Sequence, residues 1–341
     1  MPKPDPTRNL LIVHTTHLQD PSDWTAIKQR IELDAPDIEV RIANNEHSNP
    51  STKRWQVRRP SLVFSPVHLI NYVPRGGALF CGHILGKDEQ LRRLSSIGIL
   101  TPRTATLSSA SSFNSKEWGD YVIVKPNNLN SGAGVTLVRT IDLFARYEEL
   151  AGLAFTAMVR NSDMNRTPGP SAPRGRAGRP ISPEILLVQP FIDHSEDGYP
   201  TEYRVLSLFG RALYCSRNRW GNKRPPLAEI ATDPRGIIAS NNKMMGGRIR
   251  SICNDAEIIS LGERAHEAFP ECPVLGVDII RDNENGRFYV LEVNPHGAVW
   301  HLSSSLAKNM DQEHVRELYA QFNALDRAAN LLIQKTRAYA C

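Results

Sequence analysis

Short apolar runs and one amphipathic stretch alternate over the first 85 residues of the chain. Trp24, Ile27 and Ile31 recur at helical spacing, which predicts a helix over 22–34. Because no Gly-x-Gly-x-x-Gly motif follows the first apolar run, we do not expect a dinucleotide site there. The pattern predicts a small α/β domain over residues 1–85. The apolar runs have the length of strands and cover residues 9–14, 38–42, 61–64 and 78–81.

A second αβ unit follows, and we place it over residues 86–190. An amphipathic helix is predicted to begin near Lys87 and to stop at Gly98. The apolar strand at 121–124 leads into a loop of small and turn-forming residues, and then into a helix near 141–159.

Residues 160–183 interrupt this unit with arginines and prolines and without apolar periodicity. One interpretation is a basic arm for an acidic or phosphorylated partner, and the other is a solvated loop with no role. Because no aromatic residue lies between the arginines, base stacking on a nucleic acid is not indicated. The segment is therefore an insertion whose role stays open.

Strands and helices also alternate in the last region, which we place over 191–341. Gly210 lies between two apolar runs, so antiparallel pairing is expected. A helix is predicted over 255–268. A single closing helix is predicted over about 311–337, and its core-facing stripe is Val315, Leu318, Phe322 and Leu325. The strands predicted in this region cover residues 203–209 and 211–215, and a strand predicted over 185–192 leads into it.

The segment 276–295 has the pattern of two strands joined by a turn-forming run, with one half-buried face. Residues two apart on a strand share a face, so Glu292 and Asn294 converge, and the turn brings Asp278 beside them. Three oxygen-bearing side chains suit magnesium held jointly with nucleotide phosphates, although a polar sheet face is the alternative. The apolar positions of the same strands are Val277, Ile279, Tyr289, Leu291 and Val293.

Composition narrows the class of protein. The 341 residues, 40% of them hydrophobic, can bury one large core or a few smaller ones. No apolar run approaches the roughly 20 residues that cross a bilayer, and no signal peptide is present, so we expect a cytoplasmic protein without a membrane partner. Five scattered cysteines support neither a disulfide framework nor a zinc site. The formal charge of +5 suits a ligand as small as a nucleotide and does not by itself indicate nucleic acid.

Several motifs follow one another along the chain, namely Lys87, Lys125 with its glycine loop, Gln189-Pro-Phe-Ile192, Glu202-Tyr-Arg204, Asp278 and Glu292-Val-Asn294. In this order they resemble the ATP-grasp superfamily, over about residues 80–300. The resemblance is closest to the branch of glutathione synthetase and the ribosomal-protein glutamate ligases. It implies an α/β protein with two α+β subdomains that clamp ATP, preceded by a Rossmann-like domain.

The resemblance implies a phosphate site, and the residue chemistry is compatible with it. Lys87 and Lys125 would neutralise a triphosphate, although each alone could be a solvated surface charge. Ser131, Gly132 and Gly134 would let backbone amides approach the β- and γ-phosphates, although glycines here could also form an ordinary turn.

The adenosine part of the ligand would lie at two further motifs. Beside the proline after Gln189, sheet pairing should leave backbone groups free for an adenine edge, with Phe191 and Ile192 as apolar walls. A bent core strand is the alternative. Glu202 would bind the ribose or a metal ion, or form a salt bridge within the protein.

The candidate catalytic residues are Arg204, Arg217 and His296. Arg217 is our first candidate for contact with an acyl phosphate, and a salt bridge is the alternative for both arginines. His296 departs from the proline-glycine pair that relatives usually carry, and either it or His301 is a possible general base or a structural histidine. Lys243 is a secondary candidate, in a segment that resembles the one before the metal strands of relatives.

The expected activity is ATP-dependent joining of a carboxylate to an amine through an acyl phosphate, with release of ADP and phosphate. Magnesium or manganese would sit on Asp278, Glu292 and Asn294. The substrates would be a small carboxylate and an amine, such as amino acids or a peptide, and the resemblance alone is compatible with a homodimer. A thiol or other acceptor is one alternative, and a regulatory protein that binds nucleotide without turnover is another.

Overall fold

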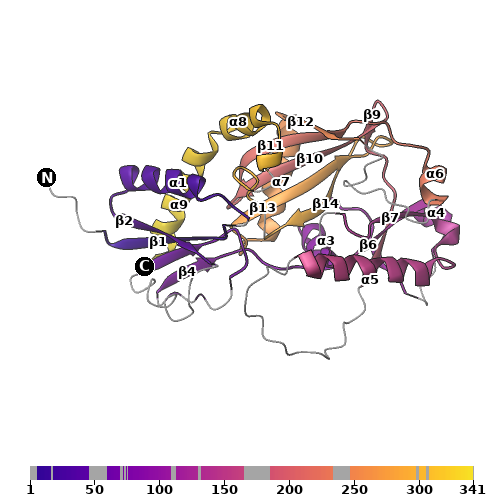
Figure 1. Ribbon diagram of the computed structural model, residues 1–341, viewed down its shortest axis with the longest axis horizontal. Coiled ribbons are helices and arrows are strands. Elements are labelled where there is room, and N and C mark those ends of the chain that lie inside the picture. The colour runs from indigo at the N-terminus through magenta and orange to yellow at the C-terminus, as the bar shows by residue number, and fades with distance from the viewer. Residues whose placement is uncertain are drawn as a thin grey trace.

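The computed structural model describes residues 6–340, except for 17, 46–59, 70–71, 73, 75, 109–112, 130–131, 165–184, 233–245, 297–298 and 305–306. Three sheets, with helices packed on them, organise these residues (Figure 1). Within the described residues, no helix has both the length and the apolar character that a membrane span requires.

The first sheet is made of β1 (Arg8–His14), β2 (Ile38–Asn44), β3 (Ser61–Phe64) and β4 (Gly77–Phe80), with α1 (Pro21–Asp34) beside it. Its strands are parallel and lie in the order β2-β1-β3-β4, as expected for the predicted α/β alternation. Asp20 caps α1 by accepting a hydrogen bond from the Ser22 amide at 3.0 Å. The predicted stripe of Trp24, Ile27 and Ile31 is buried, so this part of the prediction is confirmed.

The second sheet is antiparallel, in the order β5-β8-β6-β7. Its strands are β5 (Ala105–Thr106), β6 (Tyr121–Pro126), β7 (Thr136–Arg139) and β8 (Leu186–Pro190), and its helical elements are α3 (Lys87–Ser96), α4 (Ser115–Trp118), η1 (Thr140–Asp142) and α5 (Tyr147–Met164). The helix predicted from residue 141 begins only at Tyr147, because a 3-10 turn and a bend come first. The insertion predicted at 160–183 lies outside the described residues from position 165 onward.

The third sheet is also antiparallel, in the order β12-β11-β10-β13-β14, and β9 pairs with β10 at its margin. The predicted antiparallel pairing around Gly210 is confirmed, and Phe209 and Gly210 both have positive φ angles, of 47° and 80°. The strands are β9 (Ser195–Glu196), β10 (Tyr199–Leu208), β11 (Arg211–Trp220), β12 (Arg248–Ile252), β13 (Val274–Arg281) and β14 (Phe288–Asn294). The helical elements are α6 (Leu227–Thr232), α7 (Ala256–Ala265), η3 (His266–Ala268), η4 (Ala307–Asn309), α8 (Gln312–Gln321) and α9 (Ala324–Tyr339).

The single closing helix predicted over 311–337 is wrong, because the chain forms α8 and α9 with a break at Asn323. Asn323 has a left-handed conformation with φ of 51°, which ends α8 and redirects the chain. Val315 and Leu318 are buried as predicted, and the change of direction lets α9 pack on β1 and β3 of the first sheet.

The hairpin of β10 and β11 contains a one-residue bulge. Near the turn Ser207 pairs with Ala212, but beyond it Leu206 pairs with Tyr214, so Leu213 is an extra residue in β11. Because side chains alternate along a strand, one extra residue exchanges the two faces of β11 for all positions after it.

The hairpin of β13 and β14 contains a second bulge, at Leu291. Val290 and Val293 are therefore buried, whereas Tyr289 and Leu291 are only half-buried. The prediction that Tyr289 and Leu291 share the core face of Val293 is thus wrong, since it assumed an uninterrupted alternation.

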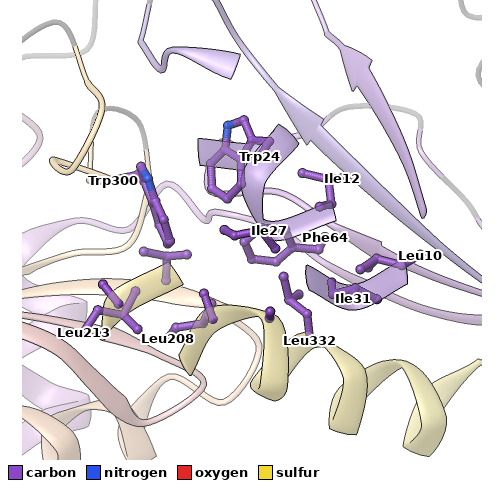
Figure 2. Close-up of a cluster of buried hydrophobic side chains, with 14 of the residues drawn as sticks. Leu10, Ile12, Trp24, Ile27, Ile31, Phe64, Leu208, Leu213, Trp300 and Leu332 are labelled. Carbon is purple, nitrogen blue, oxygen red and sulfur yellow. The ribbon is translucent and has the colours of Figure 1, made fainter. Parts of the chain in front are cut away.

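One hydrophobic core joins the first sheet to the third (Figure 2). The rings of Trp24 and Trp300 pack with their centroids 4.6 Å apart, and Leu208 of β10 belongs to the same cluster. The buried carboxylate of Asp23 accepts hydrogen bonds from Trp300 Nε1 at 2.8 Å and from the Tyr319 hydroxyl at 2.7 Å. These contacts fix the segment after β14, while the division into domains at residues 85 and 190 stays a prediction.

Candidate functional site

Three charged side chains on neighbouring strands lie in one row of the third sheet. Arg204 of β10 pairs in register with Asp278 of β13, which pairs in turn with Glu292 of β14. Arg204 Nη1 donates to both carboxylate oxygens of Asp278, at 2.9 and 3.1 Å. The Asn294 amide donates to Asp278 Oδ2 at 2.9 Å. The structure therefore brings the predicted metal ligands and Arg204 together on one face, which we call the charged face.

The bulge at Leu291 creates this arrangement. If the register next to the turn continued without it, Leu291 would oppose Asp278, and Glu292 would oppose Val277 on the core side. The extra residue turns Glu292 toward Asp278 instead. A bulge that redirects a side chain beside a functional site is a recurrent feature of sheets.

The Asp278 carboxylate is largely buried and closely surrounded by other side chains. Gly276 leaves room for the guanidinium above it, because a Cβ at this position would lie 2.6 Å from Arg204 Nη2. Burial raises the pKa of Asp278, Arg204 opposes this shift, and the negative charge of Glu292 adds to it. A bound cation would stabilise the charged form of both carboxylates.

Two buried lysines, one on α3 and one on the second sheet, approach the same end of the charged face. Lys87, at the start of α3, has Nζ 3.7 Å from Glu292 Oε2 and donates a hydrogen bond to the Leu129 carbonyl. Lys125 of β6 donates to the Leu291 carbonyl at 3.5 Å. Burial lowers the pKa of Lys125 to about 8, against the attraction of Glu292. Two cations that share one carboxylate can accommodate an additional anionic ligand.

The donor set suits a hard cation. Among the described residues, no three His, Cys, Asp or Glu side chains converge as a metal site, and the predicted set has two carboxylates and one amide. Such oxygen ligands are those that Mg²⁺ binds together with phosphates and water. In this structure Arg204 and Lys87 contact the two carboxylates, so a cation would share these carboxylates with them.

The glycine loop after β6 is described only in part. Gly132 and Gly134 have φ angles of 70° and 73°, which favour glycine over residues with a side chain. Ser131 lies outside the described residues. A role of this loop at the phosphates stays a prediction.

The expectation of free backbone groups beside Gln189 is wrong at one position. The Phe191 amide donates to the Tyr121 carbonyl at 3.0 Å, so pairing with β6 continues past the proline. The buried Gln189 side chain donates to Thr104 Oγ1 at 2.7 Å. Phe191 and Ile192 are half-buried, as apolar walls of a ligand site would be.

Arg217 lies on the face opposite to Arg204, so the structure does not bring it into the predicted site. It pairs in register with Tyr203, and its guanidinium binds Glu196 of β9. Without the bulge at Leu213, Arg217 would oppose a residue of the charged face. The expected contact with an acyl phosphate is therefore corrected to a salt bridge, the alternative that the sequence left open.

Glu202 lies on the charged face but already has a partner. Its Oε1 is 3.0 Å from Arg248 Nη2, and Asn218 and Arg250 follow it in register on β11 and β12. Arg248 and Arg250 were not predicted as site residues, although their spacing of two residues on one strand is a signal that places them on the same face. Lys243 lies outside the described residues.

The two candidate histidines occupy different surroundings. His296 packs against Gly82, where a Cβ would lie 2.7 Å from His296 Cβ, and burial lowers the pKa of His296. Burial also lowers the pKa of His301, and the charges of Arg204 and Arg250 add to this effect. His301 is therefore neutral near pH 7 and belongs to the charged face.

Two cavities lie away from the row of Arg204, Asp278 and Glu292. One of about 350 Å³ is lined by residues that include Glu196 and Tyr203, on the side of Arg217. The other, of about 380 Å³, lies between α3 and β5. Neither is the site that the sequence predicts.

No protein-family model matches the chain, and no curated protein sequence matches it. Solved structures do match. D-cycloserine synthetase DcsG has 13% identity and a TM-score of 0.50, over 93% of this chain and 99% of its own. ATP-grasp ligase PsnB, complexed with a minimal precursor, has 14% identity and a TM-score of 0.51, over 97% and 100%. PsnB with a phosphomimetic precursor variant, Mg and ADP has 12% identity and a TM-score of 0.51, over 96% and 98%. The chain therefore has the ATP-grasp fold.

Proposed function

We propose that this protein is an ATP-dependent ligase that joins a carboxylate to an amine through an acyl phosphate and releases ADP and phosphate. The observation that carries the proposal is the row of Arg204, Asp278 and Glu292, with Asn294 beside it and two buried lysines at its end. The bound forms of PsnB, with precursor, Mg and ADP, support a nucleotide and a metal ion for the same fold.

The charges assign a role to each part of the row. Lys87 and Lys125 would hold the phosphates of the nucleotide, since both are buried and both are close to Glu292. Asp278, Glu292 and Asn294 would hold Mg²⁺ or Mn²⁺, which would offset the charge that develops on the transferred phosphoryl group. Arg204 would hold the carboxylate at the γ-phosphate, because a guanidinium binds carboxylates and phosphates in a fixed geometry.

No side chain has to act as a nucleophile in this reaction. A carboxylate oxygen of the substrate attacks the γ-phosphorus, and the bond from this phosphorus to the β–γ bridging oxygen breaks, which gives acyl phosphate and ADP. The amine then adds to the acyl carbon and phosphate leaves with the pair of electrons of the C–O bond. His296 is our candidate acceptor for the amine proton, since burial keeps it neutral.

The test uses ADP release with mixtures of carboxylic acids and amines, followed by mass spectrometry of the products. The variant is Glu292→Gln, and Glu284→Gln in the exposed turn of the same hairpin is its matched control. We expect release that needs both substrates in the protein and in the control, and a loss of at least about 10³-fold in Glu292→Gln. Unchanged turnover in Glu292→Gln would contradict the metal assignment.

An isotope experiment tests the acyl phosphate separately. With ¹⁸O in the substrate carboxylate, one ¹⁸O atom should appear in the released phosphate for each amide formed. Thioester products in place of amides would indicate the thiol alternative. Nucleotide binding without ADP release across the whole panel would indicate the regulatory alternative and contradict the proposed ligase.

A further inference from the structure

An arginine of β12, Arg250, has no role in the row that would hold nucleotide and metal. It lies on the charged face, in register with Asn218 of β11 and through it with Glu202 of β10. It is half-buried, whereas its neighbours Ile249 and Ser251 are exposed. The face of β12 that carries Arg250 is therefore the one that points to the interior of the molecule.

Of the three arginines on the charged face, Arg250 is the one without an ion pair to a described residue. Arg204 is bound to Asp278 and Arg248 to Glu202, while the Arg250 guanidinium has neither an ion pair nor a hydrogen bond to any described residue. The Nε donors of Arg204 and Arg248 are buried and also have no acceptor within the described part of the chain. A buried donor without an acceptor costs free energy, so these unpaired donors favour an anionic ligand that accepts hydrogen bonds.

His301 adds a neutral donor to the same place. The Val299 side chain, two residues before His301, lies next to Gly276, where Arg204 Nη2 also lies. Burial and the charges of Arg204, Arg250 and Arg248 lower the pKa of His301. A neutral imidazole donates one hydrogen bond and adds no positive charge. The group formed by Arg248, Arg250 and His301 therefore offers donors of the kind that bind a carboxylate.

We propose that Arg250, with His301 beside it, binds a second carboxylate of the substrates, one that does not react. This inference rests on the proposed ligase function and narrows its substrates. Two strand spacings, about 10 Å, separate β12 from β10, whose Arg204 would hold the reacting carboxylate, and the Arg250 side chain covers part of this width. The ligand would thus have the size of an amino acid, a dicarboxylic acid or the end of a short peptide.

The second carboxylate belongs either to the amine substrate or to the acid substrate, and two arms of one experiment distinguish these sources. In the first arm, ADP release is measured with amino acids and dipeptides beside their carboxamides as amine substrates. In the second arm, glutarate and glutamate stand beside their monoamides as acid substrates. One arm should show a preference of about 10- to 100-fold for the free carboxylate, which is the effect of a charge-assisted hydrogen bond.

The variants make the assignment specific. Arg250→Gln should reduce this preference to within about threefold, and Arg250→Lys should keep part of it, because a lysine retains the charge without the planar fork. Arg211→Gln, at the far end of the same sheet and highly exposed, is the control and should keep the full preference. No preference in either arm, or the full preference in Arg250→Gln, would overturn the proposal.

A binding measurement separates this inference from the ligase function. Calorimetric titration of the full chain with glutamate, glutarate and alanyl-alanine, each beside its carboxamide, requires no turnover. Tighter binding of a free carboxylate that Arg250→Gln abolishes supports the subsite even if no combination releases ADP. Equal affinities for acid and amide in the unmodified protein overturn it even if ADP is released.

Discussion

Each face of the third sheet carries an arginine–carboxylate ion pair, but the two pairs differ in burial and in the role that we assign to them. On the charged face, Arg204 binds Asp278 in the middle of the sheet, with both side chains only 18% and 17% exposed. On the opposite face, Arg217 binds Glu196 at the margin, with both side chains about one third exposed at 34% and 33%. Arg204, in the middle of the sheet and paired with a largely buried carboxylate, is placed to bind an anionic ligand. Arg217, at the margin of the sheet, mainly holds β9 against β10 and β11.

Substitution of Arg204 and Arg217 is expected to show the largest difference between the two faces. We expect Arg204→Lys to lower substrate-dependent ADP release about 10²- to 10³-fold, because lysine keeps the charge but loses the guanidinium geometry. Arg217→Lys should change it by less than about threefold. Steady-state assays with matched thermal unfolding check both variants, and similar losses in the two would show that the faces do not differ in function.

Lys125 of the second sheet gives a further test, because a buried cation near the charged face costs stability. Its pKa is about 8 in the folded protein against 10.5 as the ordinary value. Between these values the unfolded chain binds more protons than the folded one, so stability rises with pH and the cost is largest below pH 8. Lys125→Met should therefore raise the free energy of unfolding by about 3 kcal/mol at pH 7 and by about 1 kcal/mol at pH 9.5.

Chemical denaturation at the two pH values measures this gain, and the exposed Lys308→Met is the control without an expected change. The same substitution should weaken ATP binding, because a triphosphate would lose a cation. A variant that is less stable at pH 7 would show that Lys125 is not an uncompensated charge.

On the opposite side of the third sheet, the buried ring of His266 should make the stability of the protein sensitive to acid. Its ring contacts Ser207 Oγ at 2.7 Å and the Cys272 carbonyl at 2.7 Å, and burial lowers its pKa to about 4. The unfolded chain takes up a proton near pH 6.5 that the folded protein does not, so stability is lost as the pH falls from 6.5 toward 4. This loss amounts to about 2 kcal/mol between pH 7 and pH 5.

The variant His266→Gln should be less stable at pH 7 but should lose less of its stability on acidification. Urea denaturation of both proteins at pH 7 and pH 5 gives the difference in pH dependence. The same pH dependence in the two proteins would exclude His266 as the titrating group.

Packing gives the smallest expected effect. A Cβ at Gly262 of α7 would lie 2.5 Å from Val205 Cβ, whereas a Cβ at Gly152 of α5 would meet nothing within 4 Å. Gly262→Ala should destabilise the protein by about 1 kcal/mol or more, and Gly152→Ala should stabilise it by about 0.5–1 kcal/mol through helix propensity. Thermal unfolding of the pair checks the contact, and a stabilised Gly262→Ala would mean that α7 is not tightly packed on β10.

Alternation along single strands was enough to predict most of the architecture. The strands of the first sheet, the helix at Trp24 and the shared face of Glu292 and Asn294 follow from periods of 3.6 or 2 within one element. The resemblance that those motifs carried agrees with the fold found by comparison with solved structures.

Relations between strands could not be read from these periods. Arg217 was assigned to the wrong side because the extra residue Leu213 exchanges the faces of β11, and nothing in the sequence around Leu213 signals a bulge. Arg250 was missed because its place beside Glu202 depends on the register of two further strands. The break at Asn323 escaped prediction because the apolar stripe of Val315 and Leu318 continues into Leu325.

The bulge at Leu291 has a consequence for how this hairpin can vary among related sequences. Deletion of Leu291 would remove the bulge and leave Val290 opposite Ile279 and Glu292 opposite Asp278, so the predicted metal ligands would stay on one face. A chain of this fold that is one residue shorter here should therefore keep both its strands and its metal ligands, whereas replacement of Glu292 itself would remove a ligand. Residue identity at position 292, more than the length of the segment, would separate active from inactive relatives at this turn.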